Sequence, residues 1–233
     1  MGVAHLPETQ PSPRARPPQK RLAPDARAQQ ILEGAIAYFA EFGFDGGTRA
    51  LAAHLGISQA LLFRYFPNKA ALVDRVYEVV FLNRWNPDWK SLLTQRELPL
   101  AARLTAFYKD YNRSIDRYEV IRISLFSALR KESISQRYVA RLREQLISPI
   151  IVECRAHLGL PTENELPLSP LEEQLVLSLH ATVIYGIMRK HVFHAAPPTD
   201  TDFLIELYVD GFVQHAPEAF RRVLARSASA SPG

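Results

Sequence analysis

Glu153, Cys154 and His157 lie close together in the sequence and are side chains of the kinds that bind metals. Spacings of three and four residues on a helix would let such groups reach one ion, as in zinc sites. No second cysteine or histidine cluster completes the site, and no neighbour clearly favours the reactive thiolate of Cys154. His191 and His194, at the expected end of a helix, more simply complement its dipole. Walker A, Rossmann and G-x-S-x-G patterns are missing, so we predict no metal, no cofactor and no enzymatic activity.

A segment in the first third of the chain has side chains that could perform a different chemistry, hydrogen bonding to DNA. Two short helices are predicted there, over residues 49–55 and 59–66, and a three-residue turn joins them. Gly56 tolerates the positive φ that a tight turn needs, and Ser58 is a suitable N-cap for the second helix. This arrangement is typical of a helix-turn-helix motif, whose second helix enters the major groove.

The faces of the two helices support this interpretation. Leu62 and Phe66, four residues apart, predict the inward face of the second helix. The first helix offers it small and apolar side chains, namely Leu51, Ala52 and Leu55. The residues left to point outward or sideways, toward a groove, are Gln59, Ala60, Phe63 and Arg64.

The same region resembles the N-terminal signature of the TetR family of bacterial transcriptional regulators. The resemblance covers roughly residues 25–80, about a quarter of the chain. It is carried by Gly43-Phe44, Thr48-Arg49-Ala50-Leu51-Ala52, Leu55-Gly56-Ile57-Ser58, Leu62-Phe63-Arg64-Tyr65-Phe66-Pro67-Asn68-Lys69 and Leu72. It implies a DNA-binding head on a helical body that senses a ligand and dimerises.

The resemblance also implies which residues contact DNA. Arg49 matches a position that often touches base edges or phosphates, and Gln59 could read an adenine edge. Asn68 and Lys69 match a phosphate contact at a helix N-terminus. The full predicted set is Thr48, Arg49, Ser58, Gln59, Ala60, Phe63, Arg64, Tyr65, Asn68 and Lys69. The chain departs from the family pattern at Gly47, Leu61 and Phe63, the last of which lacks the hydroxyl of the usual tyrosine.

Beyond this head the sequence predicts longer amphipathic helices and no strand-like alternation. The predicted fold class is therefore all-α, an N-terminal three-helix helix-turn-helix domain plus a C-terminal antiparallel helical bundle that dimerises. Helices are expected over 24–42, from 69 to about 84, and near 98–114, 118–131, 135–158 (kinked or split at Pro149), 170–194, 201–215 and 217–226, with Thr48 capping the helix at 49–55. The predicted domains are a disordered basic arm over 1–23, the head over 24–72, the body over 73–227 and a disordered tail over 228–233.

The composition is compatible with a DNA-binding regulator but is less specific evidence for one than the motif is. The 233 residues carry a net charge of +4 and have a pI of about 9.3, a mild basic bias. The single cysteine excludes an intramolecular disulfide and fits a reducing cytoplasm. No apolar run reaches the ~18 residues that a membrane span needs. We predict a cytoplasmic protein with no membrane partner.

Two apolar helices near the C-terminus are predicted to pair with their symmetry mates in a four-helix bundle. The alternative is that they form intramolecular core. Gly186 would let another helix approach closely. The apolar side chains concerned are Leu175, Leu179, Val183, Ile187, Phe203, Leu204, Leu207, Tyr208 and Phe212, with Gly211 among them.

An effector pocket is expected among the helices over 98–194, for an apolar or aromatic small molecule. Arg122 follows two apolar residues and, if buried, would need a carboxylate or an anionic ligand; alternatively it lies on a solvated face. The candidate lining residues are Phe107, Tyr111, Arg122, Phe126, His180 and Tyr185, each of which is alternatively an ordinary core or surface residue.

The leading hypothesis is a homodimeric repressor that binds double-stranded DNA at a palindromic operator and is released by a small-molecule effector. The alternative, from another class, is an all-α ligand-binding or protein-interaction module with a vestigial helix-turn-helix. A helical enzyme is a third hypothesis, but we find no set of candidate catalytic residues in the sequence that would support it. Sequence-selective, salt-sensitive DNA binding separates the first from the second.

Overall fold

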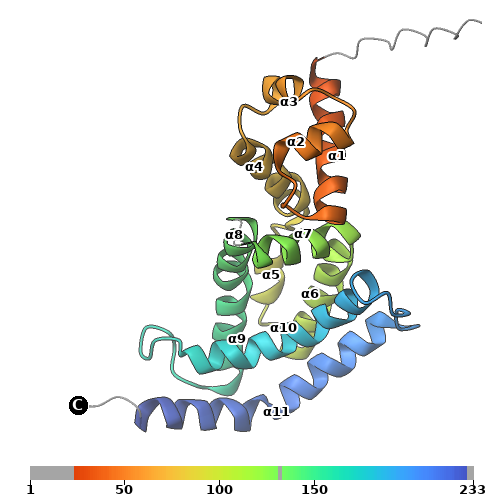
Figure 1. Ribbon diagram of the computed structural model, residues 1–233. Coiled ribbons are helices and arrows are strands. Elements are labelled where there is room, and N and C mark those ends of the chain that lie inside the picture. Colours follow the sequence, from red (N-terminus) through yellow and green to blue (C-terminus); the bar gives the residue numbers. More distant parts are fainter. Residues whose placement is uncertain (1–23, 131–132, 230–233) are drawn as a thin grey trace, which may run out of the picture.

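The computed structural model describes residues 24–130 and 133–229, and every regular element in these ranges is helical (Figure 1). The predicted all-α fold is confirmed. The predicted basic arm, 1–23, and the last residues of the predicted tail, 230–233, lie outside the described residues. The elements are α1 (Pro24–Phe42), α2 (Gly47–His54), α3 (Gln59–Tyr65), α4 (Lys69–Val80), the 3-10 turn η1 (Leu82–Arg84), α5 (Trp89–Leu93), α6 (Leu100–Ile115), α7 (Tyr118–Leu129), α8 (Ser133–Leu142), the π-helical turn η2 (Arg143–Ile147), α9 (Ser148–Leu158), α10 (Pro170–His191) and α11 (Thr201–Ser229).

Helices α1 to α4 form a head at one end of the molecule, and α6 to α11 form a larger body (Figure 1). The inward stripe of α1 contains Leu32, Ala35 and Phe39, spaced three and four residues apart and all buried. Leu51, Leu62 and Leu72 from the next three helices are fully buried in the same hydrophobic core. The head is therefore held together by apolar packing between short helices.

The starts of the head helices follow local capping rules, with one correction. The Ser58 side chain accepts a hydrogen bond from the N–H of Leu61, and Asn68 accepts one from Ala71, so both predicted N-caps are confirmed. The prediction that Thr48 caps α2 is wrong, because α2 already begins at Gly47. The Thr48 hydroxyl instead accepts a hydrogen bond from the Gln59 side chain.

Pro149 and Pro217, which both lie in the body, have different effects on the helices that contain them. The predicted 135–158 helix is split as expected near Pro149, where the π-helical turn η2 separates α8 from α9. The two predicted helices at 201–215 and 217–226 are one helix, α11, which contains Pro217 and changes direction along its length (Figure 1). The loss of one N–H at Pro217 is tolerated because Ala216 and Phe220 on either side of it are buried in the core. The predicted tail at 228–233 thus begins inside α11.

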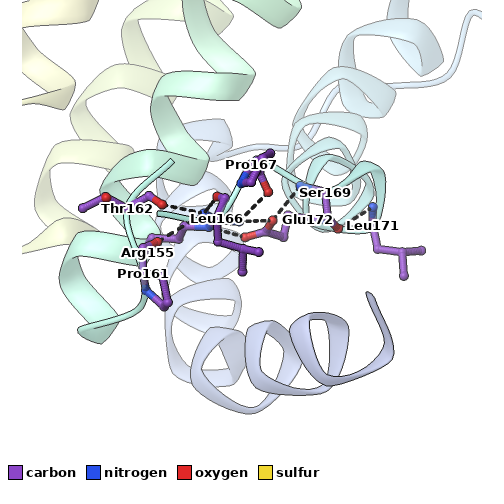
Figure 2. A network of polar contacts seen from close by, with 8 residues as sticks. All are labelled: Arg155, Pro161, Thr162, Leu166, Pro167, Ser169, Leu171 and Glu172. Carbon is purple, nitrogen blue, oxygen red and sulfur yellow. Dashed lines mark hydrogen bonds and ion pairs between the residues drawn. The ribbon is translucent and has the colours of Figure 1, made fainter. Parts of the chain in front are cut away.

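A buried ion pair fastens the connection between α9 and α10 (Figure 2). Arg155 donates from Nε and Nη2 to the two oxygens of Glu172, at 2.7 and 2.6 Å, and both side chains are almost completely buried. Further guanidinium hydrogen bonds go to the connecting segment, to the backbone carbonyls of Pro161, Thr162, Leu166 and Pro167. Glu172 also accepts from the N–H of Ser169, the N-cap of α10. This network orders the connecting segment.

We predict that Arg155→Met lowers the free energy of unfolding by about 3–5 kcal/mol, because it leaves the Glu172 carboxylate buried without its partner. Urea denaturation monitored by circular dichroism measures the loss. The control is Arg143→Met, which removes an exposed arginine from the neighbouring Glu173 and should leave stability unchanged. Equal effects of the two substitutions would contradict the assignment.

Candidate nucleic-acid interface

Helices α2 and α3 are held at a fixed angle by a tight turn and by side-chain packing. Gly56 in the turn has φ +65°, as predicted for this position. Leu51 and Leu62 are completely buried between the helices. The Nε2 of Gln59 donates to the Thr48 hydroxyl at 2.9 Å and adds a polar tie between α2 and α3.

The outer surface of this unit carries most of the predicted DNA contacts. The side chains of Arg49, Ser58, Ala60, Phe63, Arg64 and Asn68 are exposed, whereas Thr48, Gln59, Tyr65 and Lys69 are half-buried. An exposed Arg64 with a buried Leu62 is the arrangement in which one face of α3 packs and the other remains open to a groove. The assignment of single residues to bases or phosphates stays a prediction.

Three of these residues, Gln59, Asn68 and Lys69, have partners inside the protein. Gln59 uses one amide hydrogen on Thr48, and since an amide nitrogen carries two, one N–H and the carbonyl oxygen remain for an adenine edge. The Asn68 oxygen caps α4, which makes it a positioning group for the helix N-terminus. The Lys69 ammonium lies 5.8 Å from the centre of the Phe44 ring.

The head is joined to the body where the end of α1 meets α7. Arg122 donates from Nε to the carbonyl of Ala40 at 2.6 Å and from Nη2 to that of Glu41 at 3.1 Å. Its guanidinium lies over the rings of Tyr118 and Phe126, at 4.9 and 5.2 Å from their centres. Arg122 thus satisfies carbonyls that the helix end would otherwise leave without partners.

More contacts reinforce this junction. The Tyr118 hydroxyl donates to the Glu41 carboxylate at 2.5 Å, and Arg130 pairs with Asp45 in the segment before α2. Gly43 follows α1 with φ +70°, and a Cβ there would lie 2.9 Å from the Phe126 ring. Only glycine allows the chain to turn and Phe126 to approach so closely.

The structure separates the six predicted effector-lining residues into three groups. Arg122 and Phe126 lie at the head–body junction just described, where Arg122 binds backbone carbonyls rather than an anion. Phe107 and Tyr111 are fully buried and pack edge-on against Trp89. His180 and Tyr185 line one cavity, which Asn112 also lines. Asn112 had no signal in the sequence, since only the packing of α6 on α10 and α11 brings it there.

Two of the three potential metal ligands considered at the outset, Glu153 and Cys154, are buried, whereas His157 is exposed. Glu153 is buried and accepts from Arg103 at 2.7 Å and from Arg96 at 2.9 and 3.0 Å, and these arginines hold the pKa of its carboxyl below the usual value despite the opposing effect of burial. Cys154 is buried, and desolvation raises the pKa of its thiol to about 12. No helix in the described part of the chain is long and apolar enough to cross a membrane.

We predict that Gly43→Ala destabilises the protein more than Gly47→Ala. Both glycines have a positive φ, so each alanine costs about 1–2 kcal/mol, but a Cβ at Gly47 meets no atom within 4 Å. The overlap with Phe126 should add a further ~1–3 kcal/mol at Gly43, measured by urea denaturation. Combining Gly43→Ala with Phe126→Leu should recover part of this difference. Equal losses for the two alanines would argue against the close contact.

Comparison of the sequence with known families and curated proteins gives short matches. Residues 31–76 match a family model described as "Bacterial regulatory proteins, tetR family". A curated relative, the HTH-type transcriptional regulator LuxR of Vibrio harveyi, is 41% identical over 63 residues. That match covers 27% of this chain and 31% of the relative, so it spans about a third of the relative's length.

Two solved structures resemble the whole fold. A TetR family transcriptional regulator from Pseudomonas syringae pv. tomato superimposes with a TM-score of 0.54 and 20% identity, over 83% of this chain and 97% of that one. A TetR-like transcriptional regulator from Rhodococcus sp. RHA1 gives a TM-score of 0.53 and 18% identity, over 88% and 99% of the two chains. At these identities the likeness concerns the fold.

Proposed function

We propose that this chain, which belongs to the tetR family of bacterial regulatory proteins, is a repressor that binds a palindromic DNA operator as a dimer and releases it when a small molecule binds to its body. The observation that carries the proposal is the helix-turn-helix unit within residues 31–76. There α3 buries Leu62 while Ala60, Phe63 and Arg64 stay exposed. A helix so placed can enter the major groove with Arg64 near a base edge or phosphate.

Dimerisation is supported by apolar side chains left exposed on the last helix. Phe203 and Leu207, four residues apart on α11, are 52% and 49% exposed, and Gly211 continues their stripe. A Cβ at Gly211 would meet no atom within 4 Å, so another helix has room to approach. By contrast Leu179, Val183 and Ile187 of α10, also considered for the dimer, are buried within one chain.

A dimer matters because a palindrome presents two half-sites about 34–36 Å apart, or a multiple of this, and each needs its own recognition helix. A ligand that changes the separation of the two heads therefore changes the affinity for DNA. The alternative function, a ligand-binding or protein-interaction module with a vestigial helix-turn-helix, predicts a dimer that binds no duplex selectively.

We predict that Arg49→Ala/Arg64→Ala abolishes sequence-selective DNA binding. Each lost contact should cost about 1–3 kcal/mol, so that the affinity for the operator falls by at least tenfold, and wild-type binding should weaken as salt rises. Fluorescence anisotropy with a pool of short duplexes, including DNA upstream of the coding region, measures both effects. Arg143→Ala, an exposed arginine in the body, is the matched control. A folded dimer that binds no genomic duplex selectively would favour the alternative function.

We predict that Phe203→Glu/Leu207→Glu gives a monomer in sedimentation velocity, because four carboxylates would meet in an isologous interface. The monomer should also lose affinity for a palindromic duplex while keeping its helical circular dichroism. Leu129→Glu tests a different exposed leucine, 78% exposed on α7, and should leave the dimer intact. If the double variant stayed dimeric, the interface would have to lie elsewhere.

A further inference from the structure

A cavity of about 720 Å³ lies where α10 packs beside α6 and the first turns of α11. Its size is within the range of small-molecule sites. The segment joining α10 to α11 contributes Ala196, Pro197 and Pro198 to its lining. Most of the wall is apolar, and includes Val183, Ile184, Ile187, Met188, Leu204 and Ile205. Ion pairs from α6 to α11, Lys109 with Glu206 and Arg113 with Asp202, hold two of the three helices together.

Two buried polar side chains line this otherwise apolar space. Asn112 comes from α6 and His180 from α10, and each is only 7% exposed. The Nδ1 of His180 is buried and has no hydrogen-bond partner. Unlike this nitrogen, the Asn112 amide is not left both buried and without a partner. His180 packs against the rings of Tyr111 and Tyr108. Buried polar groups in proteins nearly always have partners, so the Nδ1 of His180 requires an explanation.

The charges around the cavity do not favour a charged ligand at this place. Burial lowers the pKa of His180 to about 4, so its imidazole is neutral at pH 7, with one nitrogen donating and the other accepting. Asp116, also on the lining, is paired with Lys190 at 2.8 Å and with His191 at 2.6 Å. Arg189 is exposed at the rim. A charged group near Asn112 and His180 would be desolvated without a counter-ion.

We propose that this cavity is the effector site, and that it takes an uncharged, mainly apolar molecule whose hydrogen-bonding group, a hydroxyl or a carbonyl, binds Asn112 and His180. As an effector site it rests on the proposed function, whereas ligand binding itself does not. A hydroxyl or carbonyl can hydrogen-bond to the imidazole of His180 and to the Asn112 amide, which both line the cavity, and the apolar part covers the aliphatic wall.

A physical connection leads from this cavity to the DNA-binding head. Asn112 and Asp116 lie at the end of α6, and α7 begins two residues later at Tyr118. Tyr118 and Arg122 of α7 bind the end of α1. A molecule that separates α6 from α10 moves the start of α7, and with it the contact that positions the head.

The test uses the full-length protein and three ten-carbon probes, 1-decanol, decanoate and decylammonium, in isothermal titration calorimetry. Decanol should bind saturably and more tightly than either charged probe. Asn112→Leu and His180→Phe should each weaken decanol binding roughly tenfold, since each removes a group that hydrogen-bonds to the decanol hydroxyl. Both should keep the wild-type thermal stability or exceed it, so a folding defect does not explain the loss. His157→Phe, an exposed histidine on α9 outside the cavity, should leave binding unchanged.

Three results would overturn the inference. The first is that the folded protein does not bind decanol saturably, which would be the case if a partner copy filled the cavity. The second is equal binding by wild type and both cavity variants. The third is tighter binding of decanoate than of decanol, which would indicate an anionic ligand that pairs with Arg189 at the rim. Operator affinity measured on the same samples keeps the two proposals separate: decanol binding without DNA binding overturns the proposed function alone, and DNA binding without decanol binding overturns this inference alone.

Discussion

The guanidinium of Arg122 on the last carbonyls of α1 is a central contact between the body and the head. A helix end leaves carbonyls without partners and carries partial negative charge, so a cation placed there satisfies both needs. Arg122 reaches two of these carbonyls, and its flat face rests on the rings of Tyr118 and Phe126. The close approach of Phe126 in turn requires Gly43. The direction in which α1 leaves the body, and therefore the placement of the recognition helix, depends on this group of residues.

Elsewhere in the described part of the body, the buried arginines and glutamates are paired with one another. Glu153 of α9 binds Arg103 of α6, and Glu172 of α10 binds Arg155 of α9. Burying such charges costs several kcal/mol each, which is offset only by good geometry and by additional hydrogen bonds such as those from Arg155 to backbone carbonyls. These pairs tie the first turns of α6 and α10 to α9.

At the cavity beside α10, by contrast, the buried Nδ1 of His180 has no hydrogen-bond partner. Ligand control of DNA binding requires only that the molecule bind the two states of the protein unequally, and a coupling of about 1–3 kcal/mol is typical. A shift of α7 would act on the Arg122 contact, and through it on α1 of the head.

What the sequence alone determined are the features that depend on neighbouring residues. The caps at Ser58 and Asn68, the turn at Gly56, the alternation of buried and exposed residues on α3 and the split near Pro149 all follow from local backbone geometry, and all were predicted. The tertiary structure decided what each of the remaining side chains faces. Thr48 meets Gln59 instead of capping α2, Arg122 and Phe126 lie against the end of α1 and the glycine that follows it, Pro217 stays within a continuous helix, and Asn112 reaches a cavity. The reason is that these outcomes depend on segments far away in the chain, whose position only the packed fold establishes.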